Sequence, residues 1–203
     1  MQNVKNIIFD LGGVILNIDI KLTEHALQGL GIEDFAQHMR NVHVTSFFKE
    51  YEAGRIDDDE FISSIRTLSR KNLTDEDIVN AWNALLLDFP NERIELLRKL
   101  RKKYRLFLLS NTNAIHHRQF QQQLYQQTGY YLEDLFEKTY YSHTIGLCKP
   151  DVAAYRFVIN ENNLDPAETI FIDDSEVNMS GAKEAGLQVF HLVPGKTIME
   201  LEW

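Results

Sequence analysis

Four polar groups stand beside apolar stretches of this sequence, and their residue types suit the chemistry of phosphate and metal ions. Asp10 ends the apolar run IIF, and a leucine and two glycines follow it. Burying a carboxylate without a partner is costly, so this charge should lie at the edge of the core and face a cation, a ligand or water. The other three groups are the triplet Ser110-Asn111-Thr112 after RLFLL, Lys149 in the loop GLCKPD, and the pair Asp173-Asp174 after TIFI.

These groups can form one site if the apolar stretches are strands of a parallel sheet, because ligands bind beyond the carboxyl ends of such strands. Carboxylate oxygens suit Mg²⁺, which keeps several waters and takes a substrate phosphate. Backbone N–H groups at a helix start bind phosphate, and a lysine neutralises both the nucleophile and the phosphoryl group. Asp10 would then be the nucleophile that forms an aspartyl phosphate.

Each group also has a simpler interpretation when it is taken alone. Asp10 can be a solvated carboxylate before a glycine turn, and Ser110 can cap a helix. Lys149 can be solvated, and the acidic pair can face the dipole of the following helix. The convergence of all four groups on one sheet edge is what favours a site.

The elements that would position these groups alternate along the chain. Four apolar segments are typical of buried strands, and a fifth, Thr139 to Ser142, is weaker. The four are Ile7 to Phe9, Arg105 to Leu109, Thr169 to Ile172 and Gln188 to Leu192. Helical patterns cover Asn91 to Lys103, Ala114 to Gln127, Val152 to Asn162 and Val177 to Ala185. This alternation predicts an α/β fold with a Rossmann-like, doubly wound parallel sheet.

Residues 19–88 break the alternation and contain no convincing strand. Their helical patterns are Lys21 to Leu30, Asp58 to Ser69 and Asp75 to Leu87, with Thr74 and Asp77 as a capping pair. Pro90 marks the return to alternating elements. We therefore expect a core of residues 1–18 and 89–203 with an inserted all-helical cap, 19–88, over the sheet edge. A helical subdomain that only adds core is the alternative.

Composition limits the classes of partner. The 203 residues are 44% hydrophobic and 25% charged, as in a globular protein. A formal charge of -9 argues against nucleic acid or an anionic membrane as partner, and a small molecule fits better. The single cysteine, Cys148, excludes an internal disulfide and a multi-cysteine zinc site. Asp10 interrupts the N-terminal apolar run, so a signal peptide is not expected and a cytoplasmic location is.

The four groups, in this order, resemble the motifs of the haloacid dehalogenase-like (HAD) superfamily. FDLGGV (9–14) is similar to its nucleophile motif, SNT (110–112) to its phosphate-binding motif, Lys149 of KPD to its lysine motif, and DDSEVN (173–178) to its acidic motif. The helical insert after the first strand matches the helical cap of that family. SNTNAIH (110–116) and YEAGRI (51–56) look most like small sugar-phosphate phosphatases related to the phosphatase half of epoxide hydrolases.

The resemblance implies a role for each motif residue around the metal. Asp10 would be the nucleophile and a ligand of Mg²⁺, and the carbonyl of Gly12 would be a second ligand. Asp174 would be the acidic ligand. Lys149 would be the catalytic lysine, and Asp173 would support Lys149 or the acidic ligand.

The remaining motif residues would serve the substrate or the loops. Ser110, Asn111 and Thr112 would bind the phosphate. Asn178 would hold the acidic loop, although a role only in starting a helix is the simpler interpretation. His116 would either face the substrate or lie on the surface early in a helix.

The sequence departs from the resemblance at Gly12. Phosphatases of this superfamily usually carry a second aspartate there, which protonates the leaving alcohol and later activates water. Glycine keeps the backbone carbonyl for the metal and lacks the acid. A leaving group of low pKa, such as the anomeric hydroxyl of a sugar, would need less protonation.

Three functions therefore compete. The leading one is a Mg²⁺-dependent phosphatase for a small phosphorylated metabolite, with a sugar phosphate favoured. The metal-free 2-haloacid dehalogenase branch also uses an aspartate nucleophile, but such a site has little reason to concentrate carboxylates. A non-catalytic protein that binds or senses phosphate is the third, and Gly12 is its main support.

Overall fold

Five parallel strands form the centre of the computed structural model, which describes residues 3–32 and 47–203. The strands are β1 (Asn6–Phe9), β2 (Arg105–Ser110), β3 (Lys138–Tyr141), β4 (Thr169–Asp173) and β5 (Gln188–His191). Their order in the sheet is β3-β2-β1-β4-β5. All five predicted strands are confirmed, and the segment expected to be weakest is the regular edge strand β3. Because β2 and β4 flank β1, the order reverses beside β1, where open α/β sheets bind their ligands.

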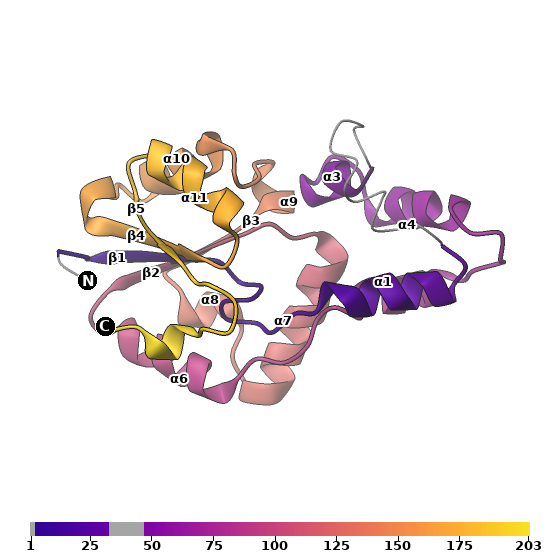
Figure 1. Ribbon diagram of the computed structural model, residues 1–203, viewed down its shortest axis with the longest axis horizontal. Helices are drawn as coiled ribbons and strands as arrows, with labels where there is room; N and C mark the ends of the chain where they lie inside the picture. The colour runs from indigo at the N-terminus through magenta and orange to yellow at the C-terminus, as the bar shows by residue number, and fades with distance from the viewer. Residues whose placement is uncertain (1–2, 33–46) are drawn as a thin grey trace.

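Helices cover both faces of this sheet (Figure 1). One face carries α6 (Asn91–Leu100), α7 (Ala114–Thr128) and α8 (Leu132–Leu135), and the other carries α10 (Val152–Glu161) and α11 (Glu176–Glu184). The side chains of β1 alternate between them: Ile7 and Phe9 pack on the first face and Ile8 on the second. The sheet is therefore buried on both sides, and the doubly wound α/β fold is confirmed.

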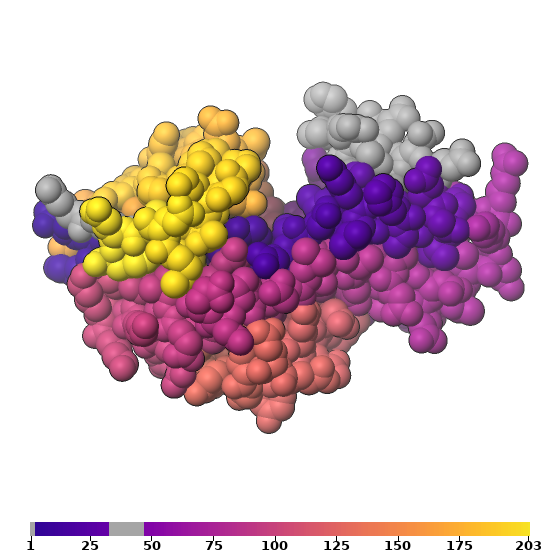
Figure 2. Space-filling model, turned by 60° about the horizontal axis from the view of Figure 1, so that its bottom comes forward, coloured from indigo at the N-terminus to yellow at the C-terminus, as the bar shows by residue number. Residues whose placement is uncertain are grey.

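Every regular element described between β1 and α6 is a helix, and these helices share a separate apolar cluster. They are α1 (Ile20–Gly29), α3 (Phe47–Glu52), α4 (Asp58–Thr67) and α5 (Asp75–Asn83). The cluster contains stacked aromatic rings, with Tyr51 and Phe61 at 4.1 Å and Phe48 and Trp82 at 5.7 Å between centroids. Figures 1 and 2 show this helical part as a lobe beside the sheet, beyond the carboxyl ends of its strands. Part of the predicted cap, 33–46, lies outside the described residues.

The two chain segments that join the helical lobe to the sheet pair with each other. Asn17 donates its N–H to Asp88, Leu87 donates to Asn17, and Ile18 forms an antiparallel bridge with Leu86. This pairing explains why α5 ends at Asn83 although the helical pattern continues to residue 87. The boundaries of the cap near residues 19 and 88 stay a prediction.

The sequence predicts one local feature of the cap and misses another. Thr74 and Asp77 form the predicted capping box, in which each side chain accepts from the other residue's N–H. The six-residue α3 was not predicted, because so short an aromatic segment has little helical periodicity of its own. Its stability comes from the packing of Phe48 and Tyr51 against the other cap helices.

The longest helix described is α7, with 15 residues, several of them glutamines. Among residues 3–32 and 47–203, no helix combines the length and apolar character needed to cross a membrane.

Candidate active site

Asp10 lies at the centre of the carboxyl edge of the sheet. The last residue of β1, Phe9, is in register with Leu108 of β2 and Ile172 of β4. The N–H of Asp10 donates to the carbonyl of Ile172 at 2.8 Å, which extends the sheet ladder by one residue. The backbone is thus fixed up to the position where the carboxylate leaves the core.

Lys149 is buried between two of the predicted carboxylates. Its Nζ lies 2.7 Å from Oδ1 of Asp10 and 2.6 Å from Oδ2 of Asp173, and its side chain is 1% exposed. The carboxylate of Asp173 is also held by the N–H of Ser175 at 2.7 Å and by Nδ2 of Asn178 at 2.9 Å. Buried charges persist only when they are paired and hydrogen-bonded, and these contacts meet that condition. These contacts place Asp173 and Asn178 beside Lys149, and their supporting role stays a prediction.

Burial and charge act against each other in this cluster. Burial raises the pKa of Asp10 to about 7, and the Lys149 ammonium opposes that rise. Burial alone would lower the pKa of Lys149, but the carboxylates of Asp10 and Asp173 outweigh it and raise that pKa. The lysine therefore stays charged at neutral pH and can offset negative charge on a nucleophile and on a phosphoryl group.

Three carboxylates are close enough to share a cation. Asp10, Asp173 and Asp174 each place one oxygen within 4.8 Å of the others. Partial burial and the neighbouring Asp173 raise the pKa of Asp174, a repulsion that a divalent cation would relieve. Gly13 has φ +72°, and a Cβ there would lie 2.1 Å from Oδ2 of Asp174, so only glycine permits this approach. An all-oxygen set with an exposed member fits Mg²⁺ and its retained waters.

The neighbouring Gly12 is under a different constraint. Its φ is not in the left-handed region, and a Cβ built on it would meet Cδ1 of Ile18 at 3.0 Å. That atom is the far end of a flexible side chain, so position 12 can accept a larger residue with a small shift. The binding of metal by the Gly12 carbonyl stays a prediction.

The triplet after β2 divides into residues with different contacts. Ser110 is buried, and no hydrogen bond joins its hydroxyl to another described residue, which leaves it available to a ligand. Asn111 instead forms two hydrogen bonds with the backbone of Lys149. Its Nδ2 donates to the Lys149 carbonyl and its Oδ1 accepts from the Lys149 N–H, both at 2.8 Å. The backbone N–H of Thr112 donates to Oγ of Ser142 at 2.9 Å. The expected helix begins later, at Ala114, so the triplet precedes it.

His116 lies neither on the surface nor free to face a ligand. It is 7% exposed and stacks on Trp82 with ring centroids 4.9 Å apart. Its ring nitrogens bond to Nδ2 of Asn113 and to the carbonyl of Trp82, each at 3.0 Å. Burial lowers its pKa to about 4. The expectation of a surface histidine was wrong, because α5 packs against this face of α7.

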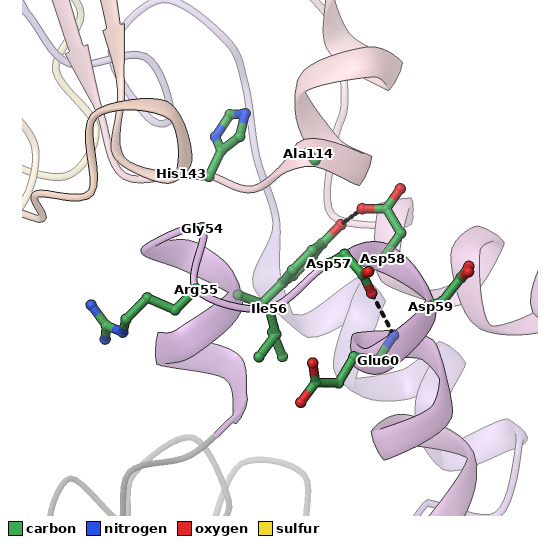
Figure 3. A pocket seen from close by; sticks show the side chains of 10 residues that line it. Gly54, Arg55, Ile56, Asp57, Asp58, Asp59, Glu60, Ala114 and His143 are labelled. Atoms are coloured by element: carbon green, nitrogen blue, oxygen red, sulfur yellow. Dashed lines mark hydrogen bonds between the residues drawn. The ribbon is translucent and has the colours of Figure 1, made fainter.

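Tyr51 and Asp58 join the cap to the core. The hydroxyl of Tyr51 donates to Oδ1 of Asp58 at 2.5 Å, the bond that reaches Asp58 in Figure 3. The same hydroxyl accepts from the N–H of Ile115 at 3.0 Å, and Asp58 also pairs with Arg118. Ile115 and Arg118 belong to α7, so two charged or polar contacts link α3 and α4 to the core. The segment YEAGRI, singled out in the sequence, is where these contacts begin.

A second set of cap contacts lies at the end of β3. Oγ of Ser142 donates to the backbone carbonyl of Glu52 or of Thr112, at 2.7 and 2.9 Å. A Cβ on Gly54, which has φ +67°, would come within 2.0 Å of the carbonyl of His143. The cap segment therefore touches the core backbone directly, at a position that only glycine can occupy.

A cavity of 660 Å³ opens beside these contacts (Figure 3). Its acidic lining consists of Asp57, Asp58, Asp59 and Glu60. None of the predicted site residues lines it, and four carboxylates would repel a phosphate dianion. It is not the phosphate site.

Known proteins resemble this chain over nearly its whole length. The family model for haloacid dehalogenase-like hydrolases matches residues 4–186. A D-ribitol-5-phosphate phosphatase of Bacteroides thetaiotaomicron is 33% identical, over 92% of this chain and 91% of its own length. A sesquiterpene phosphatase of Aspergillus oryzae is 27% identical, over 97% and 94%.

A solved structure is equally similar. A HAD family enzyme from Bacteroides thetaiotaomicron, in complex with magnesium and inorganic phosphate, is 35% identical with a TM-score of 0.88. The alignment covers 95% of this chain and 96% of that one. Agreement of this extent involves the cap as well as the sheet, and it confirms the family predicted from the four motifs: the chain belongs to the haloacid dehalogenase-like hydrolases.

Proposed function

We propose that the protein is a Mg²⁺-dependent phosphatase that hydrolyses a small phosphorylated metabolite through an aspartyl phosphate on Asp10. The observation that carries the proposal is the cluster at the carboxyl edge of the sheet. There Lys149 bridges Asp10 and Asp173, and Asp174 lies close enough to share a cation. A buried lysine between carboxylates suits a trianionic assembly of nucleophile and phosphate better than it suits a neutral substrate.

Each residue has a chemical task in this proposal. Asp10 attacks phosphorus, Lys149 offsets the charge that gathers there, and the Ser110 hydroxyl binds a phosphate oxygen. Asp10, Asp174 and the carbonyl of Gly12 would hold Mg²⁺. When bound, the ion supplies charge that draws the phosphate dianion toward the nucleophile. Asn111 acts on Lys149, whose backbone it fixes.

We favour a sugar or polyol phosphate as the substrate. The 33% identical relative is named for D-ribitol 5-phosphate, and the fungal relative for a sesquiterpene phosphate, so both act on small organic phosphates. A cap in contact with the core at Tyr51 and Ser142 also restricts the site to small molecules. The single cysteine and the acidic composition support a cytoplasmic location.

A hydrolysis screen tests the proposal. The panel contains D-ribitol 5-phosphate, hexose phosphates, a terpenyl phosphate, an aryl phosphate, a phosphoprotein and a haloacid, each with Mg²⁺ and with a chelator. We expect release of phosphate from sugar or polyol esters only with Mg²⁺. Release of halide without metal, or phosphate binding without turnover of any ester, would refute the proposal in favour of the dehalogenase or the binding protein.

A further inference from the structure

Position 12 leaves the reaction without the acid that related phosphatases usually carry there. Loss of an alcohol from phosphorus needs a proton, and attack by water on the aspartyl phosphate needs a base. Asp10, Asp173 and Asp174 are committed to Lys149 or to the cation cluster. A carboxyl group near Lys149 that lies outside these contacts is a suitable replacement.

Glu52 meets this requirement from the side of the cap. It is the last residue of α3, which Figure 1 shows beside α9 (Ser142–Ile145) at the carboxyl edge of the sheet. Its backbone is held there by the hydroxyl of Ser142 at 2.7 Å. Its carboxylate lies against the side-chain amide of Asn111 and in the field of Lys149, both of which favour its charged form.

The contacts of Glu52 connect it to the nucleophile. Asn111 bonds to the backbone of Lys149, and the ammonium of Lys149 bonds to Asp10. Glu52 and Lys149 also line one cavity of 360 Å³. The glutamate therefore lies beside the lysine that contacts the nucleophile, and no salt bridge within the described residues occupies its carboxylate.

We infer that Glu52 is the acid and base of this active site and takes the role that Gly12 cannot fill. The inference rests on the proposed phosphatase function. In the first step Asp10 attacks phosphorus, the P–O bond of the ester breaks, and the departing oxygen takes the proton of the Glu52 carboxyl. In the second step the Glu52 carboxylate takes a proton from water as the water oxygen attacks phosphorus. The bond to Asp10 breaks, and phosphate leaves with Glu52 protonated again.

The surroundings of Glu52 shift its pKa in the direction that a proton donor requires. Burial raises its pKa, while Lys149, Asn111 and Lys49 oppose the rise. The other titratable groups lining the same cavity are Arg55, Asp151 and the thiol of Cys148. Burial raises the pKa of that thiol to about 11, so it is neutral and adds no charge. An acid is most effective when its pKa lies near the working pH.

The test compares Glu52→Gln with Glu50→Gln, two residues earlier on the same helix, where Glu50 pairs with Arg55. For Glu52→Gln we expect kcat on alkyl phosphates to fall by about 10²–10³-fold, with a smaller fall on aryl phosphates that leave without a proton. The pH profile of kcat should lose one limb, and acid-quenched enzyme should retain more phosphate on Asp10. Glu50→Gln should keep the wild-type profile.

A second variant separates chemistry from structure. Adding Gly12→Asp to Glu52→Gln should recover part of kcat on alkyl phosphates, because a Cβ at position 12 meets only the flexible end of Ile18. If Glu52→Gln raises KM and leaves kcat, its leaving-group dependence and its pH profile unchanged, Glu52 only contacts the substrate and the inference is wrong. If instead wild-type enzyme hydrolyses no ester, the proposed function itself fails.

Discussion

The adjacent glycines of the nucleophile motif should differ strongly in their tolerance of a single added methyl group. Gly12→Ala places a Cβ 3.0 Å from Cδ1 of Ile18, at a backbone conformation open to any residue. Gly13→Ala places a Cβ 2.1 Å from Oδ2 of Asp174, at φ +72°. The first substitution makes a close contact with a flexible side chain. The second strains the backbone and clashes with a carboxylate of the cation cluster.

The expected magnitudes follow from these contacts. Moving the Ile18 side chain costs about 0.5–1.5 kcal/mol if its χ angle leaves its rotamer. The loss of freedom in the unfolded chain returns about 0.4–1 kcal/mol. Gly12→Ala should therefore change the free energy of unfolding by less than about 1 kcal/mol. For Gly13→Ala the left-handed backbone costs about 1–2 kcal/mol, and Asp174 must also rotate away.

Two measurements on the same samples distinguish the effects of the two substitutions. Urea unfolding gives the change in stability, and calorimetric titration gives the affinity for Mg²⁺. We expect Gly12→Ala to keep the affinity within a few-fold of wild type and Gly13→Ala to weaken it strongly. Equal affinities in the two variants would show that Gly13 does not position Asp174, and the account of the cation cluster would have to be abandoned.

Three further predictions concern single side chains. Asp10→Asn should abolish hydrolysis in a folded protein, because an amide is a poor nucleophile; turnover at the wild-type rate would exclude Asp10 as nucleophile. Asp174→Asn should weaken Mg²⁺ binding more than Asp173→Asn does. Asp173→Asn should lower the free energy of unfolding more, because Asp173 is paired with the buried Lys149. The reverse order in calorimetry and in urea unfolding would contradict these roles. His116 has a folded pKa of about 4 against 6.5 unfolded, so its contribution to stability is present above pH 6.5 and is lost as pH falls toward 4. The loss from pH 7 to pH 5 should be about 2 kcal/mol greater in wild type than in His116→Gln, measured by urea unfolding.

The sheet and its flanking helices could be predicted because their signal is local. Apolar runs such as TIFI are bounded by polar residues, and β1 and β4 are each buried on both faces, so the pattern in the sequence is strong. The positions of Asp10 and Asp173 follow from the strand ends alone. Residues directly after parallel strands meet at one edge whatever the details of packing.

The contacts that cross from one motif to another could not be predicted. Asn111 was expected to bind phosphate because it follows β2, but its amide matches the N–H and C=O of Lys149 in a loop far along the chain. His116 was misplaced because nothing in its helix reveals that Trp82 covers it. These features depend on how the cap and the core meet, and a sequence pattern records only one element at a time.

The hydroxyl of Ser142 shows how the cap and the phosphate segment are coupled. It accepts from the N–H of Thr112 and has one proton to donate, with the carbonyls of Glu52 and Thr112 both within reach. Either carbonyl can take that proton, so the hydroxyl stays satisfied whichever acceptor it uses. Because one of these acceptors is the backbone of Glu52, the position of the proposed acid depends on the contact between cap and core. A change that removes the Ser142 hydroxyl should therefore disturb both the segment after β2 and the proposed acid.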